Sequence, residues 1–125
     1  MDVHAFRTAV EARDLEAMTD ALSDDVAFHS PIAFHPFEGR EMVSEVLRHV
    51  MDTFEDFHYV DELSGDGTHA LLFRARVGER QVHGLDHFEL DGDGRIAVFT
   101  VMVRPLSAAV ALAEAMGPKV AGLKG

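Results

Sequence analysis

The spacing of hydrophobic residues divides the chain into a first part with helical periodicity and a second part that alternates like strands. The clearest helix follows Gly39, where apolar residues recur at intervals of three and four positions. This stripe consists of Val43, Val46, Leu47, Val50, Met51 and Phe54. It predicts an amphipathic helix that buries one face in a hydrophobic core.

Two shorter helices are predicted before it. Asp2 is suited to cap the first and Asp14 the second, because a short carboxylate accepts hydrogen bonds from the free N–H groups at a helix start. Their apolar stripes are Val3, Phe6 and Val10 in the first and Leu15, Met18 and Leu22 in the second. A strand over residues 25–28 follows and leads into a loop at 30–37.

From residue 57 onward the apolar positions favour strands. Four strands are predicted, over residues 57–63, 69–77, 81–90 and 95–104. Short turns that contain glycine separate them, so consecutive strands are expected to pair as a meander. Pro105 ends the last strand, and a terminal helix follows with Gly117-Pro118 as its stop. We expect one domain over residues 1–118 and a flexible tail at 119–125.

The elements therefore follow in the order helix, helix, strand, helix, four strands and helix, which predicts an α+β fold. A meander of this length with helices on one face curls into a cone, so we expect a curved mixed sheet wrapped around the helices. Such a cone encloses a central pocket between sheet and helices. Apolar pockets with a few polar groups are the usual sites for small ligands.

The amino-acid composition limits which partners and which cellular location are expected for the protein. The 125 residues include no cysteine, which excludes disulfides, thiol catalysis and thiolate metal sites. A formal net charge of −11 repels nucleic acid and anionic membranes, so neither is expected as a partner. No apolar run is long enough to span a membrane, and the N-terminus lacks the pattern of a signal peptide. A cytoplasmic location is therefore expected.

Asp86 is the strongest candidate for chemistry, because it lies on the apolar face of a predicted strand. Alternation places its side chain on the same face as Val82, Phe88 and Leu90. A carboxylate there is costly unless it is paired, protonated or lining a cavity. In a dry pocket desolvation raises its pKa, so it serves as a hydrogen-bond donor or a general base. The alternative is a structural carboxylate held by a helix N-terminus or an arginine.

Three stretches carry a likeness to a known family: Ala9–Leu15 (AVEARDL), Asp24–Gly39 (DDVAFHSPIAFHPFEG) and Asp86–Ile96 (DHFELDGDGRI). They resemble the SnoaL-like branch of the nuclear transport factor 2 / ketosteroid isomerase superfamily. The order of elements agrees from end to end, so the resemblance covers nearly the whole chain. It implies the cone fold of that superfamily but no single activity, because this fold hosts many functions.

The resemblance implies roles for three positions. Asp86 matches the family's acid that stays protonated and hydrogen-bonds the oxyanion of the substrate. Phe6 lies where the isomerases have an oxyanion-binding tyrosine, and Ser30 lies where they have the aspartate that shuttles the proton. Because both of these groups are replaced, the resemblance argues against ketosteroid isomerisation itself.

Two other reactions of the superfamily differ in how well they fit these residues. Related polyketide cyclases use an acid at about the position of Asp86 as the base for an aldol ring closure, and they need no tyrosine. Epoxide hydrolases of this fold need an arginine flanked by acids on neighbouring strands, whereas Arg74 and Arg76 have no acid beside them. If the protein is an enzyme, the resemblance implies an isomerase or a polyketide-cyclase-like lyase that works without a cofactor.

Further residues are predicted to contact a ligand. The family register turns Ser30 toward the cavity, and His35 is expected near the cavity mouth. The expected ligand-binding set is Phe6, Phe28, Ser30, His35, Phe88, Phe99, Val101 and Val103. Each has a structural alternative, as a turn cap, a surface loop residue or plain core. No metal site is expected, because His83 and His87 on one strand lie about 13 Å apart, too far to share an ion.

Two classes of function remain open. In the first, the protein binds a hydrophobic, oxygen-bearing small molecule and Asp86 polarises or deprotonates it. In the second, it is a non-catalytic ligand-binding or dimerisation module whose pocket is vestigial. The run Ala70-Leu71-Leu72-Phe73 places apolar side chains on both faces of a strand, which predicts a homodimer through the outer sheet face. A catalytic homodimer satisfies both.

Overall fold

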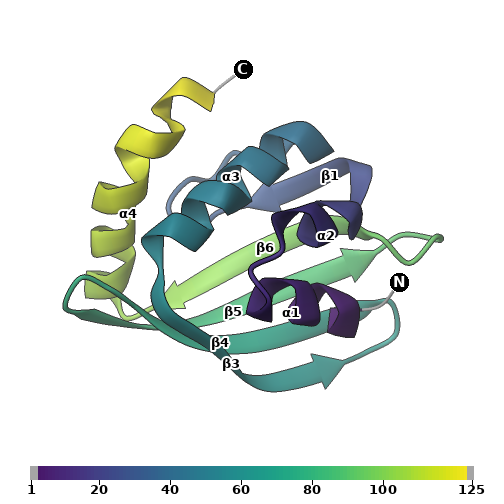
Figure 1. Cartoon of the computed structure of the whole chain (residues 1–125), viewed down its shortest axis with the longest axis horizontal. Coiled ribbons are helices and arrows are strands. Elements are labelled where there is room, and N and C mark those ends of the chain that lie inside the picture. The colour runs from purple at the N-terminus through teal and green to yellow at the C-terminus, as the bar shows by residue number, and fades with distance from the viewer. Residues whose placement is uncertain (1–2, 124–125) are drawn as a thin grey trace.

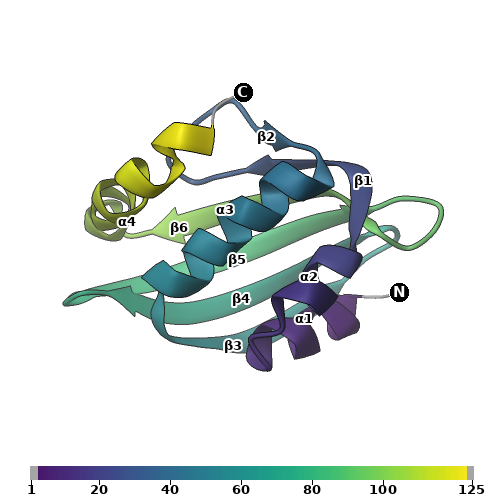
Figure 2. The same ribbon diagram turned by 45° about the horizontal axis from the view of Figure 1, so that its top comes forward.

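The long helix and the meander predicted from the hydrophobic pattern are both present in the computed structural model, which describes residues 3–123 (Figure 1). The elements are α1 (Val3–Glu11), α2 (Leu15–Asp20), β1 (Leu22–His29), β2 (Phe37–Glu38), α3 (Arg40–Thr53), β3 (Glu55–Ser64), β4 (Thr68–Val77), β5 (Arg80–Leu90), β6 (Ile96–Arg104), α4 (Leu106–Val120) and a 3₁₀ helix, η1 (Ala121–Leu123). Helices α1, α2 and α3 lie across one face of a curved sheet, and α4 stands at one end of it (Figures 1 and 2).

Strands β3 to β6 pair as the predicted antiparallel meander. Strand β1 pairs with β6 in parallel orientation, and the order across the sheet is β2-β1-β6-β5-β4-β3. The sheet is therefore mixed and open at both edges. This confirms the predicted α+β fold, in which a curved mixed sheet wraps around helices.

Strand β1 begins earlier than predicted, at Leu22, which the sequence pattern placed on the second helix. Helix α2 instead ends at Asp20, and the N–H of Ile96 donates to the carbonyl oxygen of Ala21 at 2.9 Å. Leu22 then pairs with Ile96, and both side chains are buried. Pairing with a strand that is distant in sequence overrides the local helical spacing.

One of the two predicted helix caps is present among the described residues, whereas the short strand β2 was not predicted. The Asp14 cap is confirmed, because its Oδ1 accepts a hydrogen bond from the N–H of Ala17 at 3.1 Å. The predicted cap Asp2 lies outside the described residues. Strand β2 was not predicted, since its two residues are too few to show a period. It pairs Phe37 with Phe28 and brings the 30–36 loop back to the sheet.

Helix α4 continues past the predicted stop at Gly117-Pro118 and ends at Val120. Pro118 lies inside the last turn of α4 and removes one backbone donor there. Lys119 Nζ donates to Thr53 Oγ1 at 2.7 Å, and Val120 packs against the core. Residues 119–123 are thus helical where a flexible tail was predicted, and residues 124–125 lie outside the described residues.

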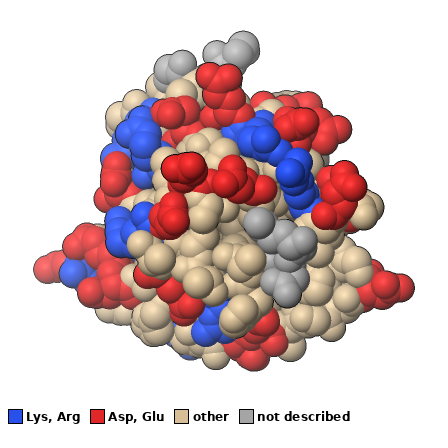
Figure 3. Space-filling view, turned by 45° about the vertical axis from the view of Figure 1, so that its right-hand side comes forward, with Lys and Arg blue, Asp and Glu red and all other residues tan. Residues whose placement is uncertain are grey.

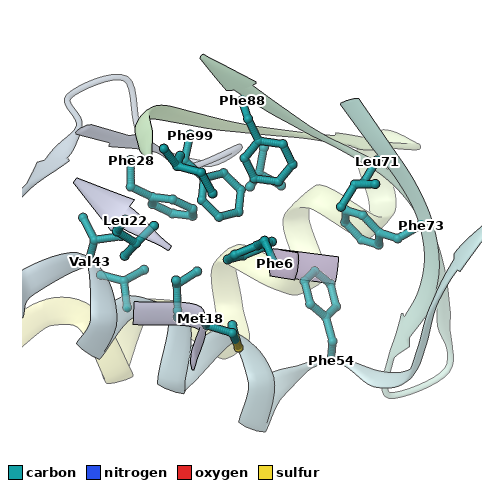
Figure 4. Packing of buried hydrophobic residues seen from close by; sticks show 14 of the residues in the cluster. Phe6, Met18, Leu22, Phe28, Val43, Phe54, Leu71, Phe73, Phe88 and Phe99 are labelled. Atoms are coloured by element: carbon teal, nitrogen blue, oxygen red, sulfur yellow. The ribbon is translucent and has the colours of Figure 1, made fainter. Parts of the chain in front are cut away.

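A cluster of phenylalanine side chains forms the core between α1 and the sheet (Figure 4). Phe6 of α1 meets the ring of Phe88 at 5.3 Å and that of Phe99 at 5.5 Å between centroids, both edge to face. Phe28 of β1 meets Phe99 at 5.0 Å in the same manner. This geometry is favourable for aromatic pairs and fixes α1 against β1, β5 and β6.

The absence of a side chain at Gly84 leaves space in the core for the ring of Phe73. It faces inward on β5 directly opposite Phe73 of β4, and a Cβ atom at this position would overlap the Phe73 ring. Phe73 is fully buried, stacks on Phe57 with centroids 4.7 Å apart and meets Phe54 at 5.5 Å. The missing side chain at residue 84 therefore allows this aromatic group to lie flat against the sheet.

The excess of acidic residues is carried on the surface. Asp24, Asp25 and Asp61 are all exposed, and Figure 3 shows acidic side chains interspersed with fewer basic ones on one face of the molecule. Solvated carboxylates of this kind mainly favour solubility and leave the interior apolar. Within residues 3–123, none of the helices combines the length and the apolar character needed to cross a membrane.

Candidate functional site

Asp86 occupies the middle of β5 and points toward the helices. On β5 its neighbours Gly84 and Phe88 are also buried, as the alternation of a strand requires. In the adjacent strands it is paired with Leu71 and Val101, both of which are buried. Only 5% of Asp86 is exposed, so the carboxyl group lies inside an apolar shell.

Tyr59 of β3 supplies the polar partner of this carboxyl group. Its hydroxyl group donates to Asp86 Oδ2 at 3.3 Å, across the intervening strand β4. Tyr59 is 7% exposed. Within residues 3–123 the other carboxyl oxygen, Oδ1, has no hydrogen-bond partner. The pair therefore leaves one oxygen of Asp86 available for a bound molecule.

Burial raises the pKa of Asp86 from 3.8 to about 8, because the apolar surroundings disfavour the charged carboxylate. The hydrogen bond from Tyr59 acts in the opposite direction and is the smaller effect. Burial also raises the pKa of Tyr59, and the nearby charge of Asp86 adds to this. At neutral pH both groups are thus mainly in their proton-bearing forms, and Asp86 can donate a hydrogen bond through Oδ1.

The Tyr59–Asp86 pair opens into a cavity of about 380 Å³ between the sheet and α1, α3 and α4. This volume lies within the range found for small-molecule sites. The apolar side chains that line it include Phe6, Val10, Met18, Phe28, Phe37, Val46, Leu47, Val50, Met51, Phe54, Phe57, Phe73, Phe99, Val101, Leu112, Met116 and Val120. The few polar side chains in its wall are Glu11, Arg13, Ser30, Tyr59 and Asp86.

The structure brings most of the residues predicted to contact a ligand to this cavity. The lining includes Phe6, Phe28, Ser30, Phe99 and Val101. Ser30 stands at the end of β1, where its Oγ accepts hydrogen bonds from the backbone N–H groups of Ala33 at 3.1 Å and Ile32 at 3.4 Å. Its hydroxyl group thus caps the turn, and Ser30 is one of the residues that line the cavity.

Three of the predicted contact residues lie away from the cavity. His35 is exposed in the 30–36 loop and does not line the cavity, although Ile32 and Ala33 of the same loop do. Phe88 is fully buried behind Phe6 and Phe99, which separate it from the cavity. Val103 pairs with the inward-facing Gly84 and packs against the core, but it does not line the cavity. Alternation alone did not distinguish a residue that lines a cavity from one that packs behind it.

Tyr59 is the polar residue that sequence reasoning missed. It is the one tyrosine of the chain, and it stands on a predicted strand two positions after Phe57. A strand pattern that puts a hydroxyl-bearing aromatic residue on the apolar face could have indicated it. Its partnership with Asp86 could not be seen, because that depends on the pairing of β3 with β4 and of β4 with β5.

One end of the cavity is lined by charged residues of α1 and the turn after it. Glu11 ends α1, and Arg13 follows with a φ of 56°, which is unusual for a residue other than glycine. Arg13 Nη2 donates to the carbonyl oxygen of Met51 on α3 at 3.0 Å. Arg7 contacts Glu11 at 3.5 Å and places its guanidinium carbon 5.6 Å from the centre of the Tyr59 ring.

Histidine and carboxylate side chains do not gather into a metal site among residues 3–123. His83 and His87 of β5 alternate with the inward residues Gly84, Asp86 and Phe88, so both face the outer side of the sheet. Among the described residues, Glu11 and Asp86 are the acidic residues that line the cavity.

Comparison with known families gives one match over most of the chain. The model of a SnoaL-like domain matches residues 3–99. A search of curated proteins found no match.

Solved structures provide closely similar folds. A steroid delta-isomerase from Pseudomonas aeruginosa is 42% identical, with a TM-score of 0.89, over 96% of this chain and 89% of that chain. An uncharacterised bacterial protein with a cystatin-like fold from Silicibacter pomeroyi DSS-3 is 31% identical, with a TM-score of 0.90, over 95% of this chain and 84% of that chain. An NTF2-like protein of unknown function from Cytophaga hutchinsonii, at 18% identity and a TM-score of 0.66 over 84% and 88% of the two chains, shares the fold.

Proposed function

Because the chain belongs to the SnoaL-like domain family, we propose that it binds a hydrophobic small molecule whose oxygen atom accepts a hydrogen bond from Asp86. The observation that carries this proposal is the Tyr59–Asp86 pair in the wall of an apolar cavity of about 380 Å³. The bond from Tyr59 occupies Oδ2 and orients the carboxyl group, so the protonated Oδ1 donates to the ligand. Phe6, Phe28 and Phe99 hold its skeleton.

A carbonyl compound is the ligand class that this site favours. A ketone oxygen accepts hydrogen bonds without bringing a charge into the cavity, where an unpaired charge would be costly. The similarity to a steroid delta-isomerase supports a cyclic keto compound, although Phe6 and Ser30 replace two groups of the isomerase pattern. Within this proposal the reaction is an isomerisation or an aldol-type cyclisation.

A pair of matched ligands tests the hydrogen bond from Asp86. The ketone 2-tetralone and the hydrocarbon tetralin have the same ring skeleton, so calorimetric titration of both isolates the contribution of the oxygen. In Asp86→Leu we expect the affinity for 2-tetralone to fall about tenfold, because a buried hydrogen bond contributes about 1.5 kcal/mol. The affinity for tetralin should stay within about twofold of that of the unchanged protein.

The same titration has a predicted pH dependence. Affinity for 2-tetralone should be constant below about pH 7 and should decrease above pH 8, where Asp86 loses the proton that it donates. Tetralin binding should show no such decrease. Equal affinities of Asp86→Leu and the unchanged protein for 2-tetralone would contradict the proposed contact.

A second proposal concerns the outer face of the sheet, which we infer forms a homodimer. Leu72, Leu85 and Met102 stand opposite one another on β4, β5 and β6 and face away from the helices. Met102 is 58% exposed, and Leu63 of β3, two positions further along, is 54% exposed. An apolar row across three strands is costly to leave in water and is typical of an interface between copies.

The dimer proposal predicts that the mass of the particle falls when a charged residue is placed in this apolar row. Leu85→Glu should convert the protein from a particle of twice 13.7 kDa to one of 13.7 kDa, because two buried carboxylates would face each other across the interface. Light scattering after gel filtration measures this. Val110→Glu, at an exposed apolar position of α4, is the control and should remain dimeric. A monomeric unchanged protein would overturn the proposal.

A further inference from the structure

Arg7 stands on α1, which lies beside the β3 edge of the sheet (Figure 2), and its side chain reaches the ring of Tyr59. The guanidinium carbon is 5.6 Å from the centre of that ring. A guanidinium group within about 6 Å of an aromatic face is attracted to it. Arg7 does not line the cavity, so it is a neighbour of the site and not part of its wall.

Two carboxylates hold the guanidinium group in this place. Nη1 of Arg7 donates to Glu62 Oε1 on β3 at 3.3 Å, and Nε donates to Glu11 Oε2 on α1 at 3.5 Å. Glu62 belongs to the same strand as Tyr59, so the first contact joins α1 to the segment that carries the tyrosine. His4 also approaches Glu62, with 3.9 Å between Nδ1 and Oε1. Arg7 is thus held from its own helix and from the strand.

The position of Tyr59 depends on such support, because β3 is an edge strand. Among the described strands β4 alone pairs with it, and this pairing is irregular between Tyr59 and Asp61. The hydroxyl group of Tyr59 must nevertheless reach across β4 to Asp86 on β5, where it donates to Oδ2 at 3.3 Å. A contact that fixes the ring of Tyr59 therefore also fixes which oxygen of Asp86 is left for a ligand.

The charge of Arg7 favours the same hydrogen bond as its position. Burial and the nearby charge of Asp86 raise the pKa of Tyr59. Glu11 adds to this effect, whereas the positive charge of Arg7 lowers the pKa of Tyr59 and so makes its hydroxyl group a better donor. The pKa of Asp86 is raised by burial and lowered by the bond from Tyr59. Arg7 therefore influences Asp86 through Tyr59.

We propose that Arg7 is a positioning residue of this site, which holds the hydroxyl group of Tyr59 on Asp86 and thereby keeps one carboxyl oxygen free for the ligand. Its role rests on the proposed function, in which the free oxygen donates to a bound carbonyl compound. The ion pairs between α1 and β3 then serve ligand binding as well as stability.

Titration of the Asp86 carboxyl group tests the role of Arg7 without a ligand. NMR of protein labelled with ¹³C-aspartate follows the carboxyl carbon of Asp86 against pH, and Asp86→Asn identifies its signal. In Arg7→Leu we expect the midpoint to rise by about 0.7 pH units, because the carboxylate loses a hydrogen bond that favours its charged form. The pH above which the affinity for 2-tetralone decreases should rise by the same amount.

A double-variant cycle shows whether Arg7 acts through Tyr59. Tyr59→Phe removes the hydroxyl group and should raise the midpoint by itself, so Arg7→Leu should add nothing in that background. Arg7→Lys keeps a positive charge beside the ring and should restore most of the midpoint of the unchanged protein. If Arg7→Leu raised the midpoint equally in the Tyr59→Phe background, Arg7 would act on Asp86 directly and the inference would be wrong.

Arg48→Leu is the matched control. Arg48 of α3 pairs with Glu45 at 2.7 Å, and about half of each side chain is exposed. This variant removes the same charge and an ion pair of the same kind but leaves Tyr59 and its neighbours in place, so the midpoint should not change. Circular dichroism confirms folding, and Arg7→Gln replaces Arg7→Leu if the latter does not fold.

The two measurements separate the role of Arg7 from the proposed function. A midpoint in Arg7→Leu equal to that of the unchanged protein would overturn the inference, while binding of 2-tetralone would still support the proposed function. If the unchanged protein did not bind 2-tetralone, the proposed function would fail and the ligand-binding role of Arg7 with it. The carbon titration would then still decide whether Arg7 holds Tyr59 on Asp86.

Discussion

Replacing Asp86 by asparagine should remove most of the loss of stability that we expect for the protein between about pH 4 and pH 8. In the folded chain the pKa of Asp86 is about 8, whereas the unfolded chain has the ordinary value near 3.8. Between these values the folded state retains a proton that the unfolded state releases. The free energy of unfolding must therefore decrease as the pH rises through this window, and it levels off above pH 8.

The size of this effect follows from the shift. Each pKa unit corresponds to about 1.4 kcal/mol, so Asp86 alone lowers the stability by up to about 5 kcal/mol across the window. Asparagine has nearly the same shape and carries no ionisable proton. Asp86→Asn should consequently be more stable than the unchanged protein at pH 8, and the two should converge toward pH 4.

Urea unfolding followed by circular dichroism at several pH values measures the difference. Asp66→Asn is the control, because Asp66 lies exposed in the turn between β3 and β4 and should leave the pH profile unchanged. Parallel profiles for Asp86→Asn and the unchanged protein would show that Asp86 does not hold its proton in the folded state. In that case the hydrogen-bond donor of the proposed function would also be lost.

Gly84→Ala should destabilise the protein by about 3 kcal/mol, although it adds a single methyl group. The new Cβ atom would overlap the ring of Phe73, which is buried and held by Phe57 and Phe54. The ring has no free space on the sheet side, so it must move toward the cavity or force β4 and β5 apart. Either movement disturbs close packing, and the first also narrows the cavity.

Two further variants separate this clash from other effects of the substitution. Gly92→Ala, in the turn between β5 and β6, meets no atom within 4 Å and should leave the stability nearly unchanged. Phe73→Leu removes the group that the new methyl meets, so Gly84→Ala should cost clearly less in that background. Chemical denaturation of the unchanged protein, Gly84→Ala, Phe73→Leu and the double variant gives the coupling energy between the two positions. Additive losses would indicate that Gly84 is required for its backbone and not for the space it leaves.

The sequence determined the parts of this protein that depend on neighbours along the chain. Helix α3 follows from its apolar spacing, and the face of Asp86 follows from alternation on β5. Such patterns are local, because they reflect which side of one element meets water. The anomaly of a carboxyl group on an apolar face is therefore visible in the sequence alone, and the fold places that group in the cavity wall.

The tertiary structure decided everything that depends on pairing between distant segments. Leu22 became part of a strand because Ile96 was available as a partner, and the last turn of α4, beyond Gly117, makes a contact between Lys119 and Thr53. The Tyr59–Asp86 pair was likewise invisible, since two intervening strand pairings bring these groups together. A sequence pattern indicates which residues avoid water, whereas the packing of the fold decides which of them are in contact. At this site the contact between Tyr59 and Asp86 determines the chemistry.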